Sequence, residues 1–170
     1  GVRYTKPVRA VDDIHFLTRE EQAIFLETAK RSHNYRQYVL LLETGLRTSE
    51  LIGLTWDSID WKKHALTINK TLEYRHKNKC WRAGPPKTEK SYRTIPLTDR
   101  AYAVLKSCYD ERDSRKESDT LSQVLEYMDR RTGRTGTLVM KDLVFINYRT
   151  GEPAKNSSYD THLYKLCDEA

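Results

Sequence analysis

The chain has 170 residues, with 30 Lys and Arg against 24 Asp and Glu, and a formal net charge of +6 at pH 7. This length fits a single domain with a core of its own, and the mean hydropathy of −0.78 is typical of a globular protein in water. The longest aliphatic run, Val39–Leu42, is far shorter than the roughly 20 apolar residues of a membrane span, and the scattered Cys80, Cys108 and Cys167 form neither a disulfide framework nor a zinc pattern, so we expect a cytoplasmic protein without membrane or metal partners.

The domain boundaries are predicted from both ends of the chain. Residues 1–16 lack a helical period and contain Pro7, so we interpret them as an interdomain linker, and residues 17–170 as one domain. The last predicted helix starts near Ser157 and reaches Ala170 without a Gly or Asn cap, and its acidic last turn opposes the helix dipole. This pattern predicts that the element continues in a longer protein.

Local signals predict three helices early in the domain. Thr18, with a Glu three residues later, forms a capping box that predicts a helix over 19–31. A second helix is predicted over 35–43, and Gly45 fits its C-terminal cap. A third, short helix is expected to end at about Leu54.

The hydrophobic period then changes from helical to alternating. Alternation predicts a strand over 65–74, and residues 92–97 (YRTIPL) are its predicted antiparallel partner. The intervening segment 76–90 is too long for a tight hairpin and contains the breaker cluster Gly84-Pro85-Pro86. We therefore expect a β-excursion inserted into the hairpin.

The remaining segments complete the fold prediction. Thr98 caps a predicted long helix over 99–116, and residues 121–128 have a helical pattern within a polar stretch. A short strand over 143–146 and a turn over 148–153 lead to the last helix. The predicted class is α+β, mainly helical, packed around a small antiparallel sheet with a basic β-hairpin insertion.

The net charge is concentrated in the predicted hairpin. Segment 70–93 has eight basic and two acidic residues, which leaves 22 of each sign elsewhere. Basic side chains neutralise phosphates and flat side chains rest on sugars or bases, so this strip is predicted to bind nucleic acid. The candidate contacts are Lys70, Arg75, Lys77, Lys79, Trp81, Arg82, Lys90 and Arg93. A solvated loop that is basic by chance remains the alternative.

The sharpest local motif is TGLRTSEL at residues 44–51. Arg47 follows a helix-ending glycine in apolar surroundings, where an unpaired charge is costly. Glu50, three residues later, lies on the same helical face and can hold the guanidinium. The pair is either a structural ion pair at a helix junction or an arginine fork aimed at a phosphate.

A second motif, GPPKTEKS, occupies residues 84–91. Its stiff prolines are expected to place the ammonium group of Lys87 at a reproducible position ahead of the next strand. A solvated turn lysine is the alternative.

The order of the predicted elements and motifs along the chain is specific. A buried helix is followed by T-G-L-R-x-S-E-L, a strand, a basic hairpin with P-K-T, a strand ending I-P-L and a long helix. In this order the sequence resembles the first half of the catalytic domain of tyrosine recombinases, the phage-integrase family. Integrases of Gram-positive conjugative transposons are the most similar type. The resemblance extends from about Leu17 to Ile146 and includes Asp57 in LTWDSID.

The resemblance implies a reaction and its participants. Double-stranded DNA, at transposon ends or attachment sites, would be cut and rejoined through a 3′-phosphotyrosyl intermediate, without a metal or nucleotide cofactor and in an oligomeric assembly on DNA. Arg47 matches the first catalytic arginine, Glu50 the acidic residue that orients it, and Lys87 the lysine that protonates the leaving 5′-oxygen. Lys90 competes with Lys87 for this last role.

The sequence lacks the second half of the family pattern. No His-x-x-Arg box is present, because His162 is followed three residues later by Lys165, and none of the 11 tyrosines stands in the nucleophile context of the family. The resemblance therefore predicts a partial active site that is inactive alone. The alternative is a non-catalytic nucleic-acid-binding module with a basic β-hairpin, in which Arg47 and Glu50 are only structural.

Overall fold

The structure is a computed structural model that describes residues 17–112, 123–147 and 152–169. The helices are α1 (Arg19–Ala29), α2 (Tyr35–Thr44), α3 (Thr48–Ile52), α4 (Asp99–Arg112) and α5 (Asn156–Glu169). The strands are β1 (Ile59–Asp60), β2 (Ala65–Ile68), β3 (Thr71–Arg75), β4 (Cys80–Gly84), β5 (Arg93–Pro96), β6 (Gln123–Met128) and β7 (Thr135–Met140). The predicted linker 1–16 and most of the predicted turn 148–153 lie outside the described residues.

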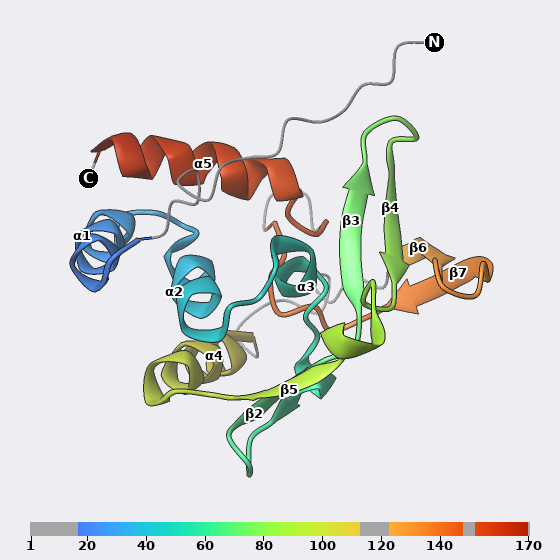
Figure 1. Ribbon diagram of the computed structural model, residues 1–170, viewed down its shortest axis with the longest axis horizontal. Coiled ribbons are helices and arrows are strands. Elements are labelled where there is room, and N and C mark those ends of the chain that lie inside the picture. The colour runs from blue at the N-terminus through green and yellow to red at the C-terminus, as the bar shows by residue number, and fades with distance from the viewer. Residues whose placement is uncertain (1–16, 113–122, 148–151, 170) are drawn as a thin grey trace.

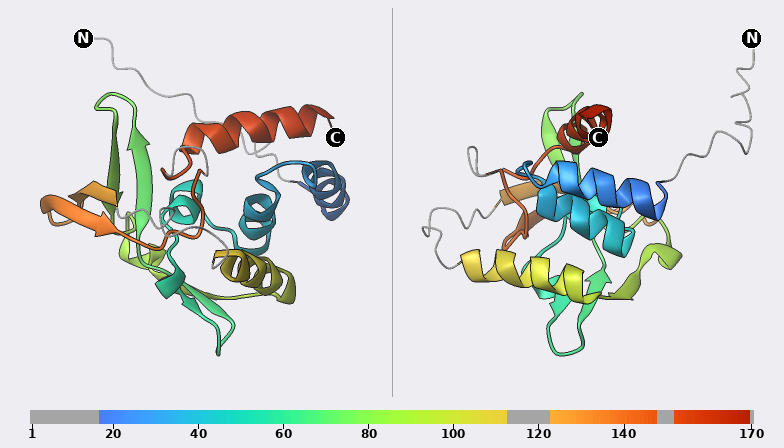
Figure 2. Two further views of the ribbon diagram at one scale, coloured as in Figure 1. Left: turned by 180° about the vertical axis from the view of Figure 1, so that it is seen from behind. Right: turned by 90° about the vertical axis from the view of Figure 1, so that its left-hand side faces the viewer.

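Helices form one side of the molecule, with α5 lying across α1 and α3, and α4 packed on α2 (Figure 1, Figure 2). The predicted capping box is confirmed, since the Glu21 N–H donates to Thr18 Oγ1 at 3.2 Å and the Thr18 N–H donates to the Glu21 carboxylate at 2.7 Å. Gly45 ends α2 with φ +64°, a left-handed conformation that favours glycine. The three predicted helices thus end within about two residues of the observed bounds.

Later helices also begin where their signals place them. Thr98 Oγ1 accepts the Ala101 N–H at 3.2 Å, so α4 starts at Asp99 as predicted, and it is described as far as Arg112. The final helix α5 begins at Asn156. None of the described helices combines the length and apolar character that a membrane-spanning segment requires.

A small antiparallel sheet with strand order β1-β2-β5 lies below the helices in Figure 1. Leu66 on β2 pairs with Ile95 on β5, which confirms the predicted partnership of these two segments. The single strand predicted over 65–74 was wrong, because it consists of β2 and β3 in two different sheets. Lys70 marks the break between them, where its ammonium group is bound by Asp57 at 3.0 Å.

The second sheet has the order β3-β4-β6-β7 and contains the predicted basic hairpin, β3–β4. Strand β6 pairs parallel to β4, with Ala83 opposite Tyr127. The helical pattern predicted over 121–128 was therefore wrong for the described part of that segment, which is strand β6. Its local period was overridden by tertiary pairing, because Leu125 is buried while Glu126 is exposed, as alternation in a strand requires.

Residues 143–145 are buried and Ile146 is partly buried, but they do not form the predicted strand. They contribute only an isolated antiparallel bridge between Leu143 and Thr55. The fold is nevertheless mixed α/β, with helices packed around small sheets as predicted, although there are two sheets among the described residues rather than one. The core that fixes α3 against β3 includes Leu51, Ile52 and Leu72, all about 1% exposed or less.

Candidate active site

Arg47 lies at the N-cap of α3, where it forms two hydrogen bonds to the Glu50 carboxylate. One Glu50 carboxylate oxygen accepts the Arg47 backbone N–H at 2.9 Å, and the other accepts Arg47 Nη1 at 3.0 Å. The predicted pairing is confirmed, but the burial is reversed. The Glu50 side chain is 1% exposed, whereas the Arg47 side chain is 67% exposed. The carboxylate is buried and the arginine fork reaches the surface.

Arg93, the first residue of β5, is the second partner of Glu50. Its Nη1 and Nη2 atoms donate to the two Glu50 oxygens at 3.0 Å and 2.9 Å, a bidentate pair. Burial alone would raise the pKa of Glu50, but the donors from Arg93 and Arg47 outweigh it and hold that pKa below its ordinary value. Glu50 is therefore a charged carboxylate at neutral pH.

Lys87 extends from the turn between β4 and β5. Pro86 is buried ahead of it, and the hydroxyl groups of Thr88 and Ser91 lie 2.9 Å apart across the following helical turn. The Lys87 side chain is exposed, and within the described parts of the chain it has no hydrogen-bond or ion-pair partner. The turn is fixed while its ammonium group is left available.

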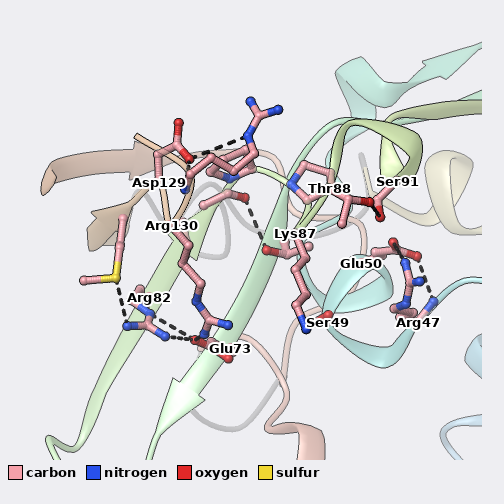
Figure 3. A pocket seen from close by; sticks show the side chains of 17 residues that line it. Arg47, Ser49, Glu50, Glu73, Arg82, Lys87, Thr88, Ser91, Asp129 and Arg130 are labelled. Carbon is pink, nitrogen blue, oxygen red and sulfur yellow. Dashed lines mark hydrogen bonds and ion pairs between the residues drawn. The ribbon is translucent and has the colours of Figure 1, made fainter. Parts of the chain in front are cut away.

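A cavity of about 380 Å³ brings these residues together (Figure 3). Arg47, Ser49 and Glu50 line it from α3, and Lys87 lines it from the turn after β4. In Figure 3 the Lys87 side chain points toward Ser49, on the Arg47 side of the cavity. Lys90 is not among the lining residues. Two cationic residues that are forty positions apart in the sequence therefore line the same cavity.

Glu73 on β3 binds several arginines on the wall of the cavity that lies opposite Arg47. It accepts Arg82 Nε at 2.9 Å and Arg130 Nη2 at 2.8 Å, and Arg75 lies 3.5 Å away. Burial opposes ionisation of Glu73, but the hydrogen bond from Arg82 and the charges of the neighbouring arginines hold its pKa below the ordinary value. One carboxylate thus faces three arginines, and the cluster keeps a net positive charge.

Two wall residues, Arg130 and Arg131, were missed by sequence reasoning. They lie in the turn between β6 and β7, and Arg131 contacts Glu89 at 3.6 Å and lies over the Tyr92 ring at 5.5 Å. The run DRRTGR at 129–134 was a visible basic signal. Only the parallel pairing of β6 with β4 places it beside Lys87.

The predicted DNA-contact residues fall into two groups. Lys77, Lys79 and Lys90 are exposed, and Arg75 is partly exposed beside Glu73. The others are occupied inside the protein. Lys70 binds Asp57, Arg82 is 12% exposed and binds Glu73, and Arg93 binds Glu50.

Trp81 does not lie on the surface predicted for it. Its residue is 7% exposed and its ring packs edge-on against Tyr74, with centroids 5.2 Å apart. The alternation of β4 explains the difference, because Trp81 and Ala83 are buried while Arg82, which lies between them, is less buried. As it lies, the indole offers no open face to a base.

Two further sequence features are placed away from the cavity. His162 on α5 faces α1 and α2, where its Nδ1 lies 3.3 Å from Asn34 Nδ2 and its ring lies 5.1 Å from that of His33. Burial and the neighbouring His33 and Lys165 lower the pKa of His162. Across the described ranges, no group of three or more His, Cys, Asp or Glu side chains could hold a metal ion.

The family model described as "Phage integrase family" matches residues 15–170. The transposase from transposon Tn916 of Enterococcus faecalis is 34% identical over 115 residues, which cover 64% of this chain and 28% of the transposase. A tyrosine recombinase XerC-like protein of Caldanaerobacter subterraneus is 28% identical over 95 residues, which cover 51% of this chain and 24% of that protein.

Solved structures share the fold. The Tn1549 transposon integrase in complex with a circular intermediate DNA superposes with a TM-score of 0.68 at 22% identity, over 92% of this chain and 46% of that one. The XerA recombinase superposes with a TM-score of 0.61 at 18% identity, over 96% of this chain and 45% of that one. This chain therefore spans less than half the length of each of these relatives.

Proposed function

The chain belongs to the phage integrase family, and from this membership we propose that it supplies the arginine and lysine half of an active site that cuts and rejoins double-stranded DNA. The observation that carries the proposal is the shared cavity of Arg47 and Lys87. The nucleophilic tyrosine of the reaction belongs to the C-terminal half of the family pattern, which this sequence lacks.

Arg47 has the geometry of a phosphate ligand. Only Nη1 of its guanidinium is used within the described residues, so Nε and Nη2 can donate to the two non-bridging oxygens of a phosphate. Negative charge grows on these oxygens as the tyrosine oxygen attacks phosphorus. Donors fixed before the reaction stabilise that charge, typically by a factor of about 10²–10³ in rate for each donor.

Lys87 takes the role of general acid at the same phosphate. The tyrosine hydroxyl loses its proton to a base that lies outside this chain as its oxygen bonds to phosphorus. The bond from phosphorus to the 5′-oxygen breaks at the same time, and the Lys87 ammonium gives its proton to that 5′-oxygen. A positioned acid of this kind typically contributes about 10²–10⁴ in rate. The lining of the cavity favours Lys87 over Lys90, because only Lys87 shares the cavity with Arg47.

The basic hairpin β3–β4 holds the DNA beside the cavity. Lys77 and Lys79 are exposed in its turn, where their charges can neutralise phosphates and release counterions. Transposon ends or attachment sites are the proposed targets, with several protein copies assembled on the DNA in the cytoplasm. The proposed chemistry uses protein side chains alone.

The test is Arg47→Ala in a protein that joins this segment to a family C-terminal half with His-x-x-Arg and the tyrosine. We expect DNA affinity close to that of the wild type and single-turnover cleavage slower by about 10²–10³. Arg31→Ala is the matched control, since Arg31 is an exposed arginine paired with Glu169 on the far side of the molecule. Cleavage at the wild-type rate by the Arg47→Ala protein would favour the non-catalytic binding module instead.

A further inference from the structure

The Glu50 carboxylate is saturated by donors from two arginines. Arg47 supplies its backbone N–H and Nη1, and Arg93 supplies Nη1 and Nη2, all within 3.0 Å. A carboxylate has about four lone-pair sites, so these four contacts fill it. Because Glu50 is 1% exposed, water cannot replace a donor that is lost.

One buried negative charge thus lies between two positive charges that are used differently. Nη1 and Nη2 of Arg93 both donate to Glu50. The remaining contacts of the Arg93 side chain are to the backbone oxygens of Ser91 at 3.3 Å and Gly45 at 3.4 Å. Its side chain is 28% exposed and does not line the cavity. Arg47 touches the same carboxylate through a single guanidinium nitrogen and is 67% exposed.

We propose that Arg93 is a positioning residue that neutralises Glu50, so that Arg47 keeps its charge and free N–H groups for the phosphate. This inference rests on the proposed function. Without Arg93, Glu50 would have Arg47 as its one cationic partner. The carboxylate would then draw the guanidinium inward and cancel the charge intended for the non-bridging oxygens.

Arg93 also connects the two backbone segments that carry Arg47 and Lys87. Gly45, whose carbonyl it binds, precedes Arg47 by two residues, and Ser91 ends the helical turn that follows Lys87. The guanidinium of Arg93 therefore fastens the α2–α3 junction to the Lys87 turn. The sequence had suggested a DNA contact for Arg93, and the two roles predict different results.

The first measurement uses the chain itself and the salt dependence of its binding to a fixed DNA duplex. Each phosphate contact contributes a slope of about −0.9 in a plot of log K against log salt. In a chain that already carries Arg47→Ala, and so lacks the Arg47 contact to phosphate, Arg93→Gln as the loss of a positioning residue leaves the slope unchanged, while the control Lys77→Gln reduces its magnitude by about 0.9. An equal reduction by both variants would overturn the proposal in favour of a direct phosphate contact.

The second measurement is single-turnover cleavage by the longer protein described above, on a duplex that the wild type cuts. Arg93→Gln should slow cleavage at least tenfold at unchanged DNA affinity, Arg93→Lys should restore part of the rate, and Arg93→Gln should have no further effect in the Arg47→Ala protein. Additive effects of the two substitutions would overturn the proposal. Wild-type cleavage by Arg47→Ala would instead refute the proposed function itself.

A folding defect is separated from this role by a second variant. The pair Glu50→Gln with Arg93→Gln leaves no buried charge, so it retains the fold when Arg93→Gln alone does not. In that background no buried carboxylate competes for the Arg47 guanidinium, so the pair variant should cleave faster than Arg93→Gln alone, and Arg47→Ala should still slow its cleavage. A folded pair variant in which Arg47→Ala has no effect would contradict the proposal.

Discussion

Arg47 and Glu50 form one ion pair with opposite exposure, since the carboxylate side chain is 1% exposed and the guanidinium side chain is 67% exposed. The Glu50 carboxylate also caps α3 through the Arg47 backbone N–H. Glu50 therefore fixes both the backbone position of Arg47 and the orientation of its guanidinium group. Stability and activity should depend on Glu50 for separate reasons.

The stability of the fold should depend on ionised Glu50. Replacing Glu50 with Ala leaves the partly buried Arg93 without its carboxylate, and we expect a loss of about 3–5 kcal/mol in the free energy of unfolding. Urea denaturation at pH 7 measures this loss. The matched control is Glu27→Ala, because Glu27 forms an exposed pair with Lys30 and should contribute less than about 1 kcal/mol.

The pH dependence of stability follows from the lowered pKa of Glu50. Its stabilisation is complete above the unfolded pKa of about 4.3 and is lost as the pH falls through that value toward the folded pKa. The wild type should therefore lose more stability between about pH 5 and pH 3 than the Glu50→Gln variant. Parallel curves for the two proteins would show that Glu50 is not the responsible group.

Loss of Lys87 should be repaired by a better leaving group. Lys87→Ala in the longer protein should slow cleavage by about 10²–10⁴. A substrate with sulfur at the bridging 5′ position needs no proton, and it should restore the rate. Lys90→Ala should have little effect on either substrate, since Lys90 does not line the cavity. Rescue of Lys90→Ala in place of Lys87→Ala would exchange the two roles.

The salt dependence of DNA binding should reside in the hairpin turn. Replacing Lys77 and Lys79 with Gln should reduce the magnitude of the slope by about 0.9 for each contact. Arg82→Gln should leave the slope unchanged although it lies in the same hairpin, because its side chain is 12% exposed and bound to Glu73. A slope that responds only to Arg82 would place the DNA on the other face of the hairpin.

Gly84 should be required for the contact between β4 and β6. A Cβ atom at this position would lie 2.3 Å from the Met128 carbonyl oxygen, a backbone atom that cannot turn aside. Gly84→Ala should therefore cost about 1–3 kcal/mol in the free energy of unfolding. Gly136→Ala on β7 is the control, since nothing lies within 4 Å of its Cβ. Equal unfolding midpoints for the two variants would contradict this strand pairing.

Signals that act over a few residues predicted the corresponding elements well. The Thr18–Glu21 capping box, Gly45 at φ +64° and Thr98 at the start of α4 each fix a helix end through local hydrogen bonds or backbone conformation. The pairing of β2 with β5 followed from their alternating side chains. Such features depend on neighbours in the sequence.

Features that depend on distant partners were not predictable in the same way. Strand β6 carries a helical pattern and is a strand because it pairs with the edge of β4. The exposure of Arg47 follows from Arg93, which lies 46 residues later and takes up the Glu50 carboxylate. The placement of Arg130 in the cavity wall depends on the same β4–β6 pairing. Each of these outcomes is set by tertiary contacts.

The most direct test of the account is a structure of this chain bound to duplex DNA, and the quantity to measure is the position of one phosphate. We predict a single phosphate with oxygens within about 2.7–3.2 Å of both the Arg47 guanidinium and the Lys87 ammonium. Arg47 and Lys87 bound to different phosphates, or either one directed into solvent while the hairpin holds DNA, would contradict the shared catalytic centre.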